Sequence, residues 1–152
     1  MDIDIRKVTA PSAAPMDLLL LADPAENLVR EYLDKGVCFS AHNGEDTVGV
    51  ILWMDTKADT VEIMNVAVRE EYQNRGIGKK LIQFAIAEIK KNGARTIEIG
   101  TGNPGVVQML LYQKCGFRIV GVDFDFFRRT HPEPIFENGI ECRDMIRMRI
   151  DV

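Results

Sequence analysis

Two glycines, Gly76 and Gly78, stand at the junction of two segments with different hydrophobic periodicities, and this junction constrains the fold most. Residues 60–68 hold a run of β-branched residues, which predicts a strand, whereas apolar residues recur at helical spacing over 79–91. The start of a helix presents unpaired N–H groups and the positive end of a dipole, so it can bind an anion. Glycines there let the main chain approach a ligand, and the flanking arginine and lysines indicate that this ligand is anionic.

Three kinds of phosphate-binding loop contain such glycines, and their spacing separates them. The dinucleotide fingerprint requires a small third residue where Leu81 stands, and no βαβ unit precedes the loop. The Walker loop requires glycine in place of Gln73 and serine or threonine in place of Lys80. The sequence therefore favours the third kind, a Gln-x-x-Gly-x-Gly loop over residues 73–78.

The rest of the hydrophobic pattern predicts an α/β arrangement of the α+β type, in which helices cover the faces of a mixed sheet. The dipeptide Asn43-Gly44 is a strong hairpin signal. No repeat or linker is visible, and 152 residues fit a single domain, 1–152. The expected order is a strand at 3–8, one or two helices within 14–36, a hairpin over 37–55, the strand 60–68, the helix 79–91, a strand at 96–100, a helix at 106–116, a strand at 117–127, a polar loop at 128–139 and a strand at 141–152.

Composition excludes several classes of function. The net charge of −4 argues against binding nucleic acid through a basic surface. The three cysteines, Cys38, Cys115 and Cys142, show no metal-ligand spacing, which predicts no metal site and a reduced, cytoplasmic compartment. The apolar run at 18–22 is too short to cross a membrane, and we expect no signal peptide.

Two motifs carry a family resemblance. Residues 66–82, VAVREEYQNRGIGKKLI, resemble the strand, loop and helix that bind acetyl-coenzyme A (acetyl-CoA) in the Gcn5-related N-acetyltransferase (GNAT) family. Residues 110–117, LLYQKCGF, resemble the family's second motif, Leu-Tyr-x-Lys-x-Gly-Phe. The resemblance covers most of the chain and is least specific before residue 37 and after residue 127.

The resemblance implies a mostly antiparallel central sheet with helices on both faces, and direct transfer of acetyl from acetyl-CoA to a primary amine of a small molecule or peptide. Two alternatives remain. The chain could be a non-catalytic GNAT-like domain that binds CoA as a sensor or scaffold, or an enzyme that transfers another acyl group. Family members often dimerise, so a homodimer is a further expectation.

The resemblance also implies which residues bind acetyl-CoA. The main chain of Val66, Ala67 and Val68 is expected to pair with the pantetheine arm. Asn103 resembles a cofactor-contacting asparagine of the family, but nine residues separate it from Tyr112, more than is usual, and an Asn-Pro turn explains it equally well. The N–H groups of the glycine loop are expected to hold the pyrophosphate, with contacts from Gln73, Asn74, Arg75, Gly76, Ile77, Gly78 and Lys79.

Acyl transfer to an amine requires a base, donors for the tetrahedral oxyanion and an acid for the leaving thiolate. Tyr112 occupies the place of the family's acid, and we favour this role over the alternative of an aromatic packing residue on an amphipathic helix. Glu98 and Glu62 compete as the base, with Glu98 slightly favoured by its place on the strand after the helix. Each could instead be a solvent-facing carboxylate, and a water chain could replace both.

The acceptor is not fixed by these motifs. Asp123 and Asp125 alternate with apolar residues in 117–127, which indicates an acidic face that suits a cationic small molecule. Nearby arginines offer the competing explanation of surface ion pairs. His42 and His131 have no metal-ligand neighbours, so both are expected to be surface or loop residues.

Overall fold

The computed structural model describes residues 1–152. Its strands are β1 (Ile3–Lys7), β2 (Val37–Asn43), β3 (Asp46–Lys57), β4 (Thr60–Val68), β5 (Thr96–Gly102), β6 (Arg118–Asp123), β7 (Phe136–Glu137), β8 (Ile140–Glu141) and β9 (Met145–Asp151). Its helices are α1 (Met16–Ala22), α2 (Glu26–Lys35), α3 (Ile77–Lys91), α4 (Val106–Lys114) and α5 (Phe126–Thr130), with short 3₁₀ turns at Pro11–Ala13 and Glu70–Tyr72. None of the helices combines the length and apolar character needed to cross a membrane.

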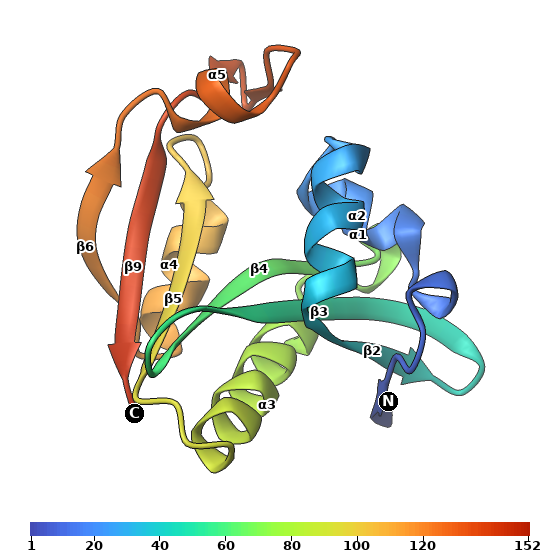
Figure 1. The fold of residues 1–152 in the computed structure, drawn as a ribbon. Coiled ribbons are helices and arrows are strands. Elements are labelled where there is room, and N and C mark those ends of the chain that lie inside the picture. Colours follow the sequence, from blue (N-terminus) through green and yellow to red (C-terminus); the bar gives the residue numbers. More distant parts are fainter.

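Seven strands form one sheet in the order β1-β2-β3-β4-β5-β9-β6, while β7 and β8 form a separate hairpin (Figure 1). Every pairing in the large sheet is antiparallel except that of β4 with β5, which is parallel. A mixed, mostly antiparallel sheet is what the sequence predicted, and the structure confirms it.

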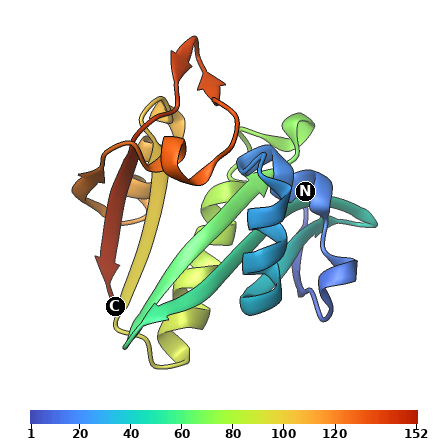
Figure 2. The ribbon, with the colours of Figure 1, turned by 45° about the horizontal axis from the view of Figure 1, so that its top comes forward.

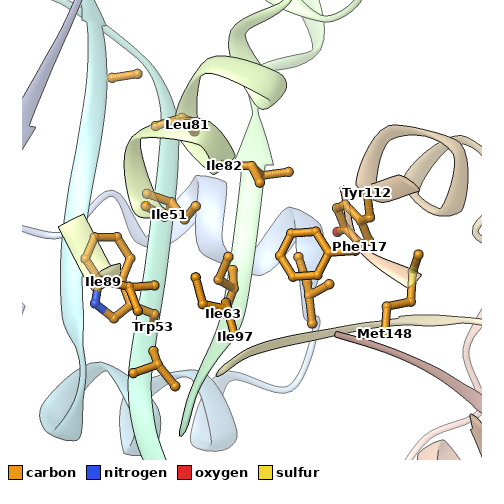
Figure 3. Close-up of a cluster of buried hydrophobic side chains, with 14 of the residues drawn as sticks. Ile51, Trp53, Ile63, Leu81, Ile82, Ile89, Ile97, Tyr112, Phe117 and Met148 are labelled. Carbon is orange, nitrogen blue, oxygen red and sulfur yellow. The ribbon is translucent and has the colours of Figure 1, made fainter. Parts of the chain in front are cut away.

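Helices cover both faces of the sheet and bury an apolar layer on each. Full burial of a large aliphatic side chain stabilises the fold by about 1.5–3 kcal/mol, so these layers hold the helices in place. On one face, α1 and α2 bury Leu18, Leu19, Val29 and Leu33 against Val50, Leu52 and Ala67. On the other face, α3 and α4 bury Leu81, Ile82, Ile89 and Tyr112 against Ile51, Trp53, Ile63, Ile97 and Met148 (Figure 3).

Local turn chemistry explains most element boundaries. Gly44 has φ of +63° in the turn between β2 and β3, as the Asn43-Gly44 signal predicted. Gly93 follows α3 with φ of +96°, and Gly116 follows α4 with φ of +104°. Glycine reaches these left-handed conformations at little cost, so each one ends its helix where the sequence placed the end.

The parallel strands β4 and β5 separate partway along their length. They pair from Thr60 opposite Thr96 to Ile63 opposite Ile99, and there the pairing stops. Beyond this point the strands diverge, as Figure 2 shows for the green and yellow arrows. The register with β3 also shifts at this place, because Ile63 pairs with Trp53 and Asn65 with Leu52, which leaves Met64 as an extra residue. A bulge and a free strand edge therefore coincide in the middle of β4.

Two predictions for the late segment were wrong. The strand expected over 117–127 ends at Asp123, because Asp125 has φ of +63° and starts α5. The polar loop expected at 128–139 includes α5 residues and leads into the β7–β8 hairpin, whose turn is Asn138-Gly139. The second dipeptide is the same hairpin signal as the first, but its strands are only two residues long, too short for an alternating pattern.

The two edges of the large sheet differ in character. β1 carries charged side chains at Asp4, Arg6 and Lys7, which discourage pairing with another chain. β6 exposes aliphatic side chains instead: Ile119, Val120 and Val122 are between 41% and 52% exposed. The β6 edge is thus apolar as well as unpaired.

Candidate active site

A cavity of about 590 Å³ opens where β4 and β5 diverge. Its floor includes Glu62, Asn65 and Tyr112, and its walls come from α1, α2, α5 and the β7–β8 hairpin. The parted strands explain why the cavity exists, since the main-chain edges beyond Ile63 and Ile99 face open space instead of each other. Residues from both halves of the sheet therefore meet there.

The glycine loop presents free main-chain donors. Lys80 is the first residue of α3 whose N–H bonds back into the loop, to the Gly76 carbonyl at 3.1 Å, and the N–H groups of residues 74–79 donate to no acceptor in the chain. Asn74 and Gly76 have φ of +63° and +82°, which turn these groups toward one side. The loop therefore has the geometry of an anion site, as the sequence predicted.

The loop side chains have separate tasks. The Gln73 amide donates to the Val68 carbonyl at 3.0 Å and ties the loop to β4. The Arg75 guanidinium lies over the Tyr72 ring, 5.2 Å from its centre, and the Lys80 ammonium donates to the Ile3 carbonyl at 3.1 Å. The Lys80 side chain thus has a structural contact with β1.

Gly78 lies where α3 approaches α4. A Cβ atom at this position would lie 3.3 Å from the Leu111 side chain and 3.8 Å from that of Val68, so a larger residue would fill the gap between the helices and β4. At Gly76 a Cβ would meet nothing, and the left-handed φ is the reason for glycine. The two glycines therefore serve different purposes: Gly76 allows the turn, and Gly78 allows α3 to pack closely against Leu111 and Val68.

Tyr112 is both a core residue and a cavity residue. It is 5% exposed and packs edge-to-face on Phe117, with ring centres 6.4 Å apart (Figure 3). Its hydroxyl makes no hydrogen bond within the chain and is not among the fully buried unpaired atoms, so it is open to the cavity that the residue lines. Burial, with smaller contributions from Cys115 and Glu137, raises the pKa of Tyr112 well above its ordinary value, so the phenol stays protonated and can donate.

Glu62 and Glu98 lie side by side on the parallel strands, and only Glu62 lines the cavity. The Glu62 side chain is 19% exposed and its carboxylate lies 3.5 Å from the Arg147 guanidinium. Burial raises the pKa of Glu62, while Arg147 opposes this shift and Glu98 adds to it. Glu98 pairs instead with Lys57 at 3.6 Å. The geometry thus favours Glu62 over Glu98, in contrast to the slight preference drawn from the sequence.

Asn103 holds the chain together rather than facing the glycine loop. Its amide oxygen accepts from the N–H groups of Arg143 and Asp144, at 2.8 and 3.0 Å, and its amide nitrogen donates to the Glu141 carbonyl at 3.1 Å. All of these partners belong to the segment before β9. The side chain is fully used, which supports a structural role in place of the cofactor contact that the resemblance implied.

The acidic face expected at Asp123 and Asp125 does not form. Asp123 pairs with the Arg129 guanidinium at 2.8 Å and with Arg147 at 3.4 Å, and Asp125 pairs with Arg143 at 2.5 Å. The reason is the end of β6, because the left-handed Asp125 points the two carboxylates to different partners. The competing explanation of ion pairing was the correct one.

His131 lies in a loop directly after α5, as the sequence predicted, but it is not a surface residue. Its side chain is only 6% exposed, and its Nε2 lies 2.9 Å from Asp23 Oδ1 while its Nδ1 lies 2.7 Å from the Thr130 hydroxyl. Asp23 and His131 both line the cavity, together with Tyr32 and Asn65. The sequence offered no signal for this group, because 108 positions separate Asp23 from His131.

Comparisons with known proteins agree with this geometry. An uncharacterized N-acetyltransferase of Bacillus subtilis (strain 168), YvbK, is 54% identical over 136 residues, which are 90% of this chain and 88% of that protein. A Bacillus subtilis acetyltransferase solved in complex with CoA is 50% identical, with a TM-score of 0.93 over 99% of both chains. A GNAT family acetyltransferase from Elizabethkingia anophelis with acetyl-CoA bound is 42% identical, with a TM-score of 0.95 over 99% of this chain and 98% of that one.

The model of the acetyltransferase (GNAT) family matches residues 11–117, so this chain belongs to the GNAT family. It is an acetyl-CoA-dependent acyltransferase, which confirms the activity class and the cosubstrate that the two motifs implied.

Proposed function

We propose that this protein transfers acetyl directly from acetyl-CoA to a primary amine of a small molecule or peptide. The observation that carries the proposal is that Glu62 and Tyr112, a carboxylate and a protonated phenol, line one cavity at the parting of β4 and β5. A base and an acid that line one space are what acyl transfer to an amine requires.

We propose that acetyl-CoA binds to main-chain groups that have no partner within the chain. The N–H groups of residues 74–79 hold the pyrophosphate, and the unpaired edge of Val66–Val68 pairs with the pantetheine arm as an added strand would. This path leads the thioester toward the bulge at Met64, where the ladder is interrupted and a main-chain N–H could donate to the developing oxyanion.

The proposed chemistry uses one group at each step. Glu62, directly or through water, takes a proton from the acceptor ammonium, and the free amine attacks the thioester carbonyl. The tetrahedral intermediate then collapses, the carbon–sulfur bond breaks, and the Tyr112 hydroxyl gives its proton to the leaving thiolate. The raised pKa of Glu62 suits a base that must accept a proton near neutral pH.

A screen of amines with acetyl-CoA, read by release of free thiol, tests this function. We expect turnover with at least one amine and loss of the rate in Glu62→Gln. Glu98→Gln is the matched control, since Glu98 lies beside Glu62 in the register but outside the cavity lining. Acetyl-CoA binding measured by calorimetry, with no turnover of any amine, would instead identify a CoA-binding sensor or scaffold.

We also propose a cytoplasmic location. All three cysteines are free thiols, and Cys38 and Cys142 are buried, where no disulfide partner reaches them. Burial raises the pKa of the Cys142 thiol to about 11, which keeps it protonated and unreactive. Localisation by fractionation of the native host tests this point.

A further inference from the structure

One wall of the cavity, formed by Asp23, His131, Tyr32 and Asn65, is polar and is not explained by the transfer chemistry. Asp23 caps the end of α1, and its side chain is 18% exposed. The Ala25 N–H and His131 Nε2 contact the same carboxylate oxygen, Oδ1, at 3.1 and 2.9 Å. Both contacts hold the carboxylate from one side and leave Oδ2 without either of them.

Two acceptor oxygens of this wall are left without a hydrogen bond in the chain. The Asn65 amide nitrogen donates to the Leu19 carbonyl at 2.9 Å and to the Tyr32 hydroxyl at 2.7 Å. This leaves Asn65 Oδ1 as the only buried side-chain polar atom of the chain without a partner. Burial, and further the Asp23 charge, raise the pKa of Tyr32, so the phenol stays protonated. The free acceptors are therefore Asn65 Oδ1 and Asp23 Oδ2.

The rest of the cavity is mostly apolar. Its outer walls include aliphatic, thioether and aromatic side chains of α2, β3, α5, β9 and the start of the β7–β8 hairpin: Leu28, Met54, Phe127, Met145, Ile135 and Phe136. At the mouth, Leu21 and Phe136 are 62% and 67% exposed. Large apolar groups that line a mouth and remain exposed indicate a ligand that covers them.

The remaining carboxylates of the lining offer little to a polycation. Glu31 pairs with Lys35 at 3.5 Å, and Glu62 pairs with Arg147. Glu137 lies exposed at the mouth, on β7. Asp23 is recessed, at 18% exposed, and its contacts with the Ala25 N–H and His131 use Oδ1 alone, so its Oδ2 is left to receive a cation.

We propose that the acceptor is an amine with a single ammonium group on an apolar, aryl or alkyl body, and that Asp23 binds this ammonium. His131 is a positioning residue that orients the carboxylate. The apolar body fills the space between α2, α5 and the hairpin. This inference rests on the proposed function, since it names the substrate class of the same site.

Two comparisons test the proposal with the intact protein. The first compares kcat/KM for 2-phenylethylamine and n-hexylamine with that for spermidine, and we expect the two apolar amines to be at least about tenfold better. The second compares Asp23→Asn with wild type. Losing one charge-assisted hydrogen bond should raise KM for 2-phenylethylamine at least about tenfold. In this variant kcat, KM for acetyl-CoA and the acidic limb of the pH profile should be unchanged.

Control variants distinguish a failure of this inference from a failure of the proposed acetyl transfer. Asp17→Asn, at an exposed residue of the same helix paired with Arg69, should leave every parameter unchanged. His131→Gln should raise KM without lowering kcat. If no amine is turned over, calorimetric binding of 2-phenylethylamine to the CoA-loaded protein replaces the rate assay, and weaker binding by Asp23→Asn supports the proposal even then.

Three results would overturn it. One is a preference for spermidine over both apolar amines. Another is an unchanged KM, or unchanged binding, in Asp23→Asn. The third is loss of kcat together with the acidic limb in Asp23→Asn, because this would make Asp23 the base rather than the binding group.

Discussion

Replacing Tyr112 with phenylalanine separates catalysis from packing more cleanly than any other single change in this chain. The ring lies in the core against Phe117, and phenylalanine keeps that contact. The hydroxyl has no protein partner, so its removal leaves no donor or acceptor unsatisfied. We therefore expect the free energy of unfolding to change by less than about 1 kcal/mol. For a chain of this size, that is a shift in Tm of no more than about 2–4 °C.

The effect on the rate should be far larger. Removal of a general acid costs about 10²–10⁴ in rate, which corresponds to about 2.7–5.5 kcal/mol in the activation barrier. Because burial holds the pKa of Tyr112 above its ordinary value, the phenol is protonated throughout the usual assay range. The deficit of Tyr112→Phe should therefore be nearly constant with pH below the ordinary tyrosine pKa.

Three measurements on Tyr112→Phe decide the matter. Thiol release gives kcat, calorimetry gives the affinity for acetyl-CoA, and thermal melting gives stability. Solvent-viscosity and isotope effects establish that chemistry, not product release, limits the rate. Equal kcat values under chemistry-limited conditions would refute the acid role and leave Tyr112 as a packing residue. A large fall in Tm would show that the lost activity reflects damage to the core.

Further predictions concern the loop, the base and the sheet edge. Gly78→Val should weaken acetyl-CoA binding by calorimetry at least tenfold, since two or three charge-assisted bonds of about 1.5–3 kcal/mol are at stake; unchanged affinity in the folded variant contradicts the loop assignment. Glu62→Gln should lose the acidic limb of kcat/KM, which Glu98→Gln should keep. The raised pKa of Glu62 means that the folded state binds its proton more tightly than the unfolded state, so this residue lowers stability as pH rises through that pKa. Glu62→Gln should remove this loss, which melting curves against pH will show or disprove. If β6 paired antiparallel with β6 of a second copy about the centre of the strand, Arg118 would lie opposite Asp123. We therefore expect sedimentation to show weak, concentration-dependent dimers that Val120→Lys abolishes. A wild-type protein that stays monomeric at high concentration excludes this pairing.

Features decided by local chemistry were predictable from the sequence. The Asn43-Gly44 turn, the glycine that ends α3 and the free N–H groups of the glycine loop all depend on a few adjacent residues. The same holds for the alternating strands and the apolar stripe of α3. The family resemblance then supplied the mostly antiparallel sheet with helices on both faces, which no local pattern determines.

Features decided by distant contacts were not predictable. Asp23 and His131 meet only because α1 and α5 lie on either side of one cavity, and neither residue has a neighbour in the sequence that reveals this. Asp125 departs from the alternating pattern because its left-handed conformation is stabilised by the Asp144 carboxylate, which accepts from its N–H at 2.8 Å. Glu62 and Glu98 both alternate with apolar residues, so the sequence pattern is the same for both. The choice between them depended on which carboxylate lines the cavity, and this is known only from the structure.

The short pairing between β4 and β5 has a mechanical consequence. It joins the half-sheet β1–β4 to the half-sheet β5-β9-β6 by only the pairs from Thr60 to Ile63. A molecule held between the parted strands ties the two half-sheets together beyond that seam. A ligand at 100 times its Kd stabilises the folded state by about 2.7 kcal/mol, which raises Tm by several degrees. The concentration of acetyl-CoA is therefore expected to set how well this protein resists unfolding, in addition to how fast it works.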